Sequence, residues 1–397
     1  MELLHELVVM AKKNVRNYGM NIAFVVIIAF FTITTKGLFL SPRNISNLIN
    51  QNAYIAVMSV AMTLILVIQK IDLSVGYFAG FMGAVAAVFL EKAGMPVGVA
   101  IPAVLALGAL FGLFNGFLVA RVGVPAFVAT LGGMFLFKGL LVYVINQVAG
   151  GSVVINDDVF NMIGNGFLPE IARVMNLHLL SVLIGAACIV AFVYFQFRSR
   201  RNLVKYGFEV TSMPVFIVKL ALISVLIAYL TYLLASYNGF SWTAVIVAAV
   251  AFCYNFVMNK TTFGRHVYAV GGNPEAAELS GINVKRLTMI VFVSMSAMAA
   301  LAGIMLSSRL KTATAVLGQG KELYAIAGAF VGGTSPAGGI GKVTGSIIGA
   351  YIMASLTNGM NLMGIGSDFQ DIAVAVVLVL AVVFDILTHK AKTASVN

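Results

Sequence analysis

Long apolar runs separated by short polar segments dominate this chain, and the runs predict helices that cross a membrane. Each run approaches or exceeds the length that a helix needs to span the hydrocarbon core, about 17–25 residues. None shows the alternation of apolar and polar residues that strands of a membrane barrel require. The pattern therefore predicts an all-α integral membrane protein, built as a polytopic helical bundle. The runs lie at 18–35, 53–68, 75–90, 97–119, 126–145, 177–197, 215–235, 241–258, 287–308, 343–361 and 369–387.

One further segment, 322–340, starts apolar and is then interrupted by glycines and Pro336. Basic residues concentrate on the cytoplasmic side of membrane proteins, and Lys/Arg clusters in the tail 1–17 and in loops 198–214 and 259–286. Both termini are therefore expected in the cytoplasm, which requires an even number of crossings. Letting 322–340 cross as a broken helix gives about twelve spans, whereas a re-entrant segment would leave eleven.

Composition supports the membrane assignment. The 397 residues are 60% hydrophobic and 10% charged, with a mean hydropathy of +1.00, whereas a soluble domain carries about 25% charged residues. The net charge of +11 is explained by basic cytoplasmic loops and does not indicate nucleic acid. The longest less apolar stretch, 146–176, is too short for a soluble domain, so residues 1–397 are expected to form a single membrane domain. Cys188 and Cys253 lie inside apolar runs and are predicted to be small core residues.

No pattern for covalent chemistry, a metal or a bound nucleotide is found. The histidines are scattered along the chain, and the segment nearest to a P-loop, SPAGGIGKVTG, has Pro336 in place of the first glycine and Val343 where Ser or Thr is needed. We therefore expect no enzyme activity, no metal site and no cofactor in this chain. If ATP drives the protein, ATP and magnesium must be bound by another subunit.

The polar loop 259–286 contains signals for a short helix. Asn273-Pro274 is typical of a helix start, the acidic residue Glu275 suits a first turn, and Gly281 can end the helix. The loop is therefore predicted to place a short helix along the cytoplasmic membrane surface. An ordinary solvated connection is the alternative.

Three further segments are expected to interrupt the membrane helices or to let them pack closely. In the first, residues 69–76, Asp72 lies between two apolar runs, and a carboxylate at membrane depth needs a partner; a solvated turn is the alternative. In the second, residues 112–139, Asn115 and Pro125 mark a helical hairpin, and Thr130, Gly132 and Gly133 form a small face for close packing. In the third, 332–341 holds five glycines and one proline. Non-helical backbone survives at membrane depth only when protein or a cavity surrounds it, so this segment is predicted to be buried or else to be a surface loop.

Together, these four segments resemble the permease subunits of ribose, xylose and multiple-monosaccharide ABC importers. That family commonly shows Gly-Gly-Ile-Asp-Leu-Ser-Val-Gly, and this chain keeps 71–76 but has Gln69 and Lys70 in place of the two glycines. It also shows Pro-Pro-Phe-Ile-x-Thr-Leu-Gly followed by Arg-Gly, where Val124 and Lys138 replace one proline and the arginine here. Its Gly-Gly-Thr-Ser-x-x-Gly-Gly segment corresponds to residues 332–339. The extra length around 198–240 is similar to the xylose and multiple-sugar subgroup.

The resemblance implies a multi-pass permease of the bacterial inner membrane that imports a monosaccharide, xylose or a related sugar, by alternating access. It implies a homodimer of permease chains, two ATP-binding subunits or one fused ATPase, and a periplasmic sugar-binding protein. Contact with the ATPase falls in the coupling loop 259–286, at Asn273, Pro274, Glu275, Ala276, Ala277, Glu278, Ser280 and Gly281. The translocation pathway and broken helices fall at Asp72, Ser74, Gly76, Asn115, Thr130, Gly332, Gly333, Thr334 and Ser335. A branched-chain amino-acid permease and an ion-coupled secondary transporter are the alternative functions.

Overall fold

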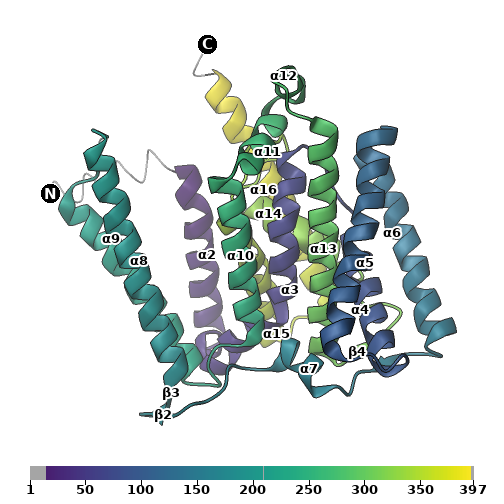
Figure 1. Ribbon diagram of the computed structural model, residues 1–397. Coiled ribbons are helices and arrows are strands. Elements are labelled where there is room, and N and C mark those ends of the chain that lie inside the picture. Colours follow the sequence, from purple (N-terminus) through teal and green to yellow (C-terminus); the bar gives the residue numbers. More distant parts are fainter. Residues whose placement is uncertain (1–14, 209, 395–397) are drawn as a thin grey trace. The chain divides into compact units, whose positions relative to one another are not determined.

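The structure is a computed structural model that describes residues 15–208 and 210–394, with side chains from 22 to 383 apart from 209 (Figure 1). Lys12 and Lys13, which contribute to the predicted cytoplasmic N-terminus, lie outside the described residues. The described chain forms two compact units. The first comprises residues 15–47 and 167–241, and the second comprises 48–166 and 242–394.

The first unit contains two long helices that pack together in a hairpin, α8 and α9, with Gly185 against Thr231. His178 caps α8, because its Nδ1 accepts a hydrogen bond from the Ser181 N–H. The first unit also has two short strands, which are joined by a two-residue turn with positive φ at Met175 and Asn176, as is typical of a tight hairpin. The elements are α2 (Val15–Thr34), a 3₁₀ turn (Leu38–Leu40), β2 (Arg173–Val174), β3 (Leu177–His178), α8 (Leu179–Lys205) and α9 (Met213–Ala235).

Just before this strand hairpin, the exposed side chains of Glu170 and Arg173 form an ion pair. The Arg173 Nε donates a hydrogen bond to the Glu170 carboxylate, which lowers the pKa of Glu170 below its usual value. Exposed pairs of this kind add little to stability, so the pair is not needed to hold the unit together.

The second unit contains most of the buried core. Its elements are α3 (Pro42–Val67, whose first residues belong to the first unit), α4 (Val75–Glu91), α5 (Val97–Phe117), α6 (Ala126–Tyr143), β1 (Val153–Val154), α7 (Asp158–Asn165), α10 (Trp242–Lys260), α11 (Thr262–Gly272), α12 (Pro274–Leu279), α13 (Val284–Leu310), β4 (Thr312–Ala313), α14 (Lys321–Val331), α15 (Val343–Leu362) and α16 (Ser367–Ala394). One π-helical turn follows α5 (Leu118–Val122) and another follows α6 (Val144–Val148).

The helix α13 lies at the centre of this unit and packs closely on α4 and α5. Glycines on α5 allow the approach: Gly108 faces Ala300, Gly112 faces Phe292 and Ser296, and Gly116 faces Met289. Small residues four positions apart let helix backbones come close in a membrane, where the hydrophobic effect does not drive helices together. The three helices therefore form a tightly packed block.

The second unit has two ends, each marked by a different element. At one end, α12 follows α11; at the other, β4 pairs antiparallel with β1, with Val153 opposite Ala313 (Figure 1). The helix α4 runs between these ends. Its first turn follows the end of α3, and Glu91 in its last turn accepts a hydrogen bond from the Asn156 N–H, close to β1. We call these two ends of the unit the α12 end and the β4 end.

Seven of the described helices are long and apolar enough to span a membrane, and this finding does not confirm the predicted count of about twelve spans. The seven are Pro42–Val67, Val97–Val122, Ala126–Val148, Leu179–Lys205, Met213–Ala235, Trp242–Lys260 and Val284–Leu310. With 17 residues, α4 is shorter than these helices, and α14 has only 11. The mostly helical, membrane-type architecture itself is as predicted.

Several sequence predictions need correction. Cys188 and Cys253 are exposed side chains, not core residues, because they lie on outward faces of α8 and α10, where a membrane protein presents apolar surface to lipid. The helix α3 begins at Pro42, eleven residues before the predicted start at 53, since its polar first turns are helical although they are not apolar. The loop 259–286 contains a second helix, α11, in addition to the expected short one.

Candidate functional site

The segment 68–74 breaks the path between α3 and α4 in the second unit. Asp72 is fully buried, and its Oδ1 accepts hydrogen bonds from the Ser74 N–H at 2.9 Å and the Ser74 hydroxyl at 2.6 Å. The carboxylate thus closes a local turn that satisfies a free N–H at the start of α4. Its second oxygen, Oδ2, is buried and has no hydrogen-bond partner among the described residues. Asp72 is therefore enclosed by protein and is not part of a solvated turn.

The predicted hairpin motif lies against this broken segment. The buried Thr130 hydroxyl of α6 reaches the Ile71 carbonyl at 3.3 Å, and Gly133 lies against the Ser74 side chain. Asn115 of α5 is also buried, and its amide nitrogen lies beside Gly133. Gly132, in contrast, faces open space among the described residues, so the small face proposed for α6 consists of Thr130 and Gly133 without it.

Lys138, which replaces the arginine of the family motif, has no carboxylate within salt-bridge distance in the described part of the chain. Its side chain is exposed, and Nζ lies 5.7 Å from the centroid of the Tyr77 ring. An ammonium over a tyrosine face gains roughly 0.5–1 kcal/mol at such a site. Lys138 therefore keeps its ammonium at the surface, next to Tyr77 of α4, as a snorkelling lysine does.

The glycine-rich segment between α14 and α15 is non-helical, as predicted. Gly332, Thr334 and Ser335 are buried, while Gly333 is exposed with a φ of +85°. Gly332 packs against the backbone of Gly345 in α15. The Thr334 hydroxyl lies 3.4 Å from the Ser346 Oγ, which also contacts the Thr63 hydroxyl of α3. Buried hydroxyls thus link this segment to α3 and α15.

The two broken segments and the end of α11 meet at one point, which we call the inner junction. The Gly339 N–H donates to the Val67 carbonyl at 2.9 Å, and the Gln69 Nε2 donates to the Gly271 carbonyl at 2.8 Å. The Tyr268 hydroxyl of α11 donates to the Gly341 carbonyl at 2.7 Å. Three sequence-distant segments are therefore hydrogen-bonded together at the α12 end of the unit.

Directly after the inner junction, α12 is presented at the surface. Asn273 caps it by accepting from the Ala276 N–H, and Gly281 follows it with a φ of +85°, so the predicted short helix is confirmed. Ala277 is buried, whereas the other coupling residues named from the sequence, Asn273, Pro274, Glu275, Ala276, Glu278, Ser280 and Gly281, are exposed. Leu279 is 90% exposed. A short helix with an exposed leucine and exposed acids is suited to contact another protein.

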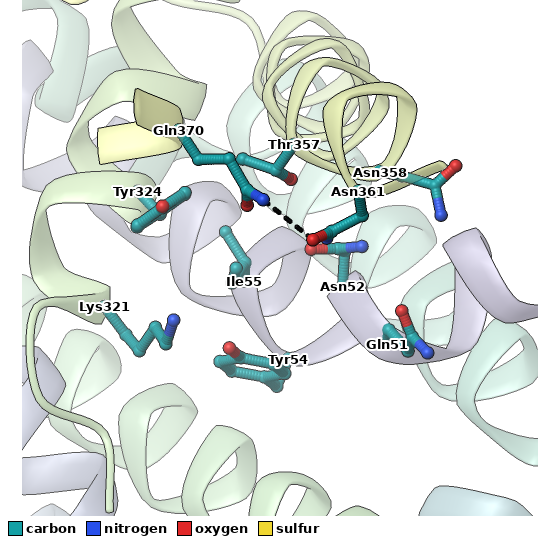
Figure 2. Close-up of a pocket in the computed structure, with 10 residues that line it drawn as sticks. All are labelled: Gln51, Asn52, Tyr54, Ile55, Lys321, Tyr324, Thr357, Asn358, Asn361 and Gln370. Carbon is teal, nitrogen blue, oxygen red and sulfur yellow. Dashed lines mark hydrogen bonds between the residues drawn. The ribbon is translucent and has the colours of Figure 1, made fainter. Parts of the chain in front are cut away.

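A polar pocket lies between α3, α14, α15 and α16, and sequence reasoning missed it. Figure 2 shows the side chains that line it, which are Gln51, Asn52, Tyr54, Ile55, Lys321, Tyr324, Thr357, Asn358, Asn361 and Gln370. Its volume is about 170 Å³. The signal in the sequence was a group of amide residues near the ends of apolar runs. The predicted span at 53–68 started after Gln51 and Asn52, and the other amides lay inside predicted spans whose packing the sequence does not reveal.

Polar contacts hold the lining in place. The Gln370 Nε2 donates to the Asn361 Oδ1 at 2.7 Å and to the Ile365 carbonyl at 2.9 Å, the first of which is drawn in Figure 2. The Tyr324 hydroxyl donates to the Asp371 carboxylate at 3.0 Å, and the Lys321 Nζ lies 4.9 Å from the Tyr324 ring centroid. These contacts join the start of α16 to α14 and α15.

A family model described as the permease component of branched-chain amino acid transport systems matches residues 44–383. The chain belongs to this permease family. Its relatives include the xylose transport system permease protein XylH of Haemophilus influenzae, 39% identical over 377 residues, which cover 95% of this chain and 98% of that protein. The XylH protein of Escherichia coli K12 is 38% identical over 377 residues, 95% and 93% of the two chains. The ribose import permease protein RbsC of Haemophilus influenzae is 33% identical over 365 residues, 92% and 91%.

No solved structure matches the permease. The matched residues 44–383 include both broken segments, α12 and the pocket. The site described above therefore lies within the part of the chain that defines the family.

Proposed function

We propose that this chain is the membrane-spanning subunit of an ATP-driven importer for a monosaccharide, xylose or a related sugar, in the bacterial inner membrane. The similarity to XylH over 95% of the chain carries this proposal. The inner junction supports it, because it connects α11, and through it α12, to both broken segments. The chain itself would provide the path for the sugar and perform no covalent chemistry.

The partners follow from the same proposal. Two permease chains would form a homodimer, with two ATP-binding subunits or one fused ATPase on the cytoplasmic side and a sugar-binding protein in the periplasm. ATP and magnesium would be bound by the ATPase. The residues of loop 259–286 from Asn273 to Gly281 would contact the ATPase. Movement of the ATPase would be transmitted through Gln69 to the segment that holds Asp72, Ser74 and Gly76. It would be transmitted through Gly339 to the segment Gly332 to Ser335.

Twelve crossings remain our proposal for the topology, with both termini in the cytoplasm. Between β4 and Gly339 the chain passes from one end of the second unit to the other, since β4 pairs with β1 whereas Gly339 bonds to Val67. A path of this kind supports 322–340 as a broken crossing segment. In this proposal the α12 end faces the cytoplasm and the β4 end faces the periplasm.

Single-cysteine labelling tests this topology. Because Cys188 and Cys253 are exposed, both are first replaced by alanine. We expect cysteines at Ser152 and Asn238 to react with an impermeant maleimide in intact spheroplasts, and cysteines at Asn202 and Ser280 to react only after permeabilisation. Labelling of Asn202→Cys in intact spheroplasts would overturn the twelve-span topology.

The role of α12 is tested by reversing the charge of Glu275 and by replacing the glycine that follows the helix. Glu275→Lys and Gly281→Val are expected to reduce sugar uptake and co-purification of the ATPase by at least about tenfold, since a like-charge contact across an interface costs several kcal/mol and valine is strained at positive φ. Asp158→Lys, an equivalent charge reversal in the first turn of α7 at the β4 end, is the matched control. Normal ATPase recovery and uptake in both α12 variants would remove this helix from the proposed interface.

A branched-chain amino-acid substrate is the second candidate, because the description of the family names that class. The relatives named for xylose and ribose favour a sugar. Uptake of labelled D-xylose, D-ribose and L-leucine by the reconstituted importer, each with its cognate binding protein, separates the two. An ion-coupled transporter would instead show uptake without the ATPase.

A further inference from the structure

The pocket of Figure 2 lies far from the inner junction. Tyr54 precedes Val67 by thirteen residues on α3, which at about 1.5 Å per residue places it some 20 Å along the helix from that junction. The lining residues outside α3 lie near the end of α15 and the starts of α14 and α16. The pocket is thus in the half of the unit nearer the β4 end, on the side proposed to face the periplasm.

Four uncharged residues of the lining keep hydrogen-bonding capacity for a ligand. Gln51 is exposed and has no hydrogen-bond partner among the described residues. In Asn361, the Oδ1 accepts from Gln370, and within the described chain the Nδ2 has no partner. Both N–H groups of Gln370 are used, which leaves its Oε1 as an acceptor. The Thr357 hydroxyl donates to backbone carbonyls of its own helix and keeps its acceptor capacity. The pocket therefore offers both donors and acceptors.

The charged groups at its edge are already engaged. Lys321 lies over the Tyr324 ring, and Asp371 accepts the Tyr324 hydroxyl. Ile55 is the one lining residue, of those that the structure describes here, with an aliphatic side chain. A cation would meet the Lys321 ammonium and find no carboxylate in the lining, and a branched aliphatic group would find only Ile55 as an aliphatic partner. A ligand with several neutral hydroxyls fits both constraints.

We propose that this pocket is a sugar-recognition site within the permease, which binds one neutral polyhydroxylated ring as it leaves the binding protein. The inference rests on the proposed function and assigns residues to it, namely Gln51, Asn361, Gln370 and Thr357. Each sugar hydroxyl both donates and accepts, and an amide side chain does the same with neighbouring atoms. The volume of about 170 Å³ corresponds to roughly ten water-sized spaces, at about 15 Å³ each, which suits a single pentose.

Gln51→Leu and Asn361→Leu test the site, with Asn255→Leu as the matched control. Asn255 is an exposed asparagine of α10 that does not line the pocket. The complete importer with its binding protein is reconstituted in proteoliposomes, and D-xylose and D-ribose are the probes. Uptake of the transported probe is expected to fall at least about fivefold in both pocket variants, because each lost hydrogen bond changes affinity about two- to tenfold. ATP hydrolysis stimulated by the binding protein should stay within twofold of wild type, and the control should be unchanged.

Gln51→Leu decides the outcome, because this exposed, unbonded side chain can be replaced without breaking a contact. Wild-type uptake in Gln51→Leu and Asn361→Leu would overturn the proposed site while leaving the sugar importer intact. Loss of stimulated ATP hydrolysis together with uptake in Gln51→Leu would also overturn it, since the residue would then serve assembly. If the wild-type importer takes up neither sugar, the proposed function itself is rejected, and this outcome is distinct from rejection of the pocket alone.

Discussion

Replacing Asp72 with alanine is expected to abolish sugar uptake, whereas asparagine is expected to retain most of it. The Asp72 Oδ1 accepts both the Ser74 N–H and the Ser74 hydroxyl in a fully buried setting. Alanine leaves both donors without a partner, at a cost of about 1–3 kcal/mol for each buried group. Asparagine keeps an acceptor oxygen at the same position. Initial uptake rates in proteoliposomes, normalised to the amount of assembled complex, measure the difference.

The asparagine variant separates two roles for Asp72. Retained uptake means that the oxygen acts as a cap at the start of α4, which the geometry favours because a sugar is neutral and needs no ionic partner. Loss of uptake in asparagine as well as alanine would show that the charge itself is required. Normal uptake in both variants would contradict any role for Asp72 in transport. Ser236→Ala, which removes an exposed hydroxyl bonded to its own helix, is a suitable control.

Gly271→Ala is expected to uncouple ATP hydrolysis from uptake, with at least about a tenfold loss of transport. A methyl group on Gly271 would lie 1.9 Å from the Val67 carbonyl oxygen and 2.7 Å from the Gly339 nitrogen. The end of α11 must therefore move away from both broken segments, and overpacking of this kind costs about 1–3 kcal/mol. The hydrogen bonds from Gly339 to Val67 and from Gln69 to Gly271 lengthen as a result.

The next residue provides the control for this experiment. Gly272 has open space where a methyl group would be added. Gly272→Ala therefore makes the same glycine-to-alanine substitution without a steric clash. Uptake and ATP hydrolysis are measured side by side for both variants. Equal transport by Gly271→Ala and Gly272→Ala would show that the inner junction does not carry the signal from α12.

Most helices were predictable because membrane spans are long, apolar and bounded by polar residues or proline. The short helix after Asn273 was predictable for another reason: a cap, a proline and a following glycine are local signals that do not depend on tertiary contacts. The start of α3 was missed since its first turns contain several asparagines. The exposure of Cys188 and Cys253 was missed because an apolar run does not reveal which helix face meets lipid.

The candidate site was only partly predictable. The sequence identified Asp72 and the 332–341 segment as interruptions of the helices. The contacts at Gly271, however, come from Gln69 and Gly339, about 200 and 70 positions away in the chain. The pocket depended on Gln51, Asn361 and Gln370 coming together from three helices. Each of these amides alone resembles an ordinary helix-end residue. Contacts of this kind depend on tertiary packing, which no local pattern encodes.

The close approach of α5 to α13 has a consequence for the permease outside its native bilayer. Gly108, Gly112 and Gly116 bring one backbone against the other, so the contact depends on shape and dispersion, not on the expulsion of water. Detergent molecules or a bilayer of different thickness have little to change there. Solubilisation should therefore leave the α5–α13 pair intact.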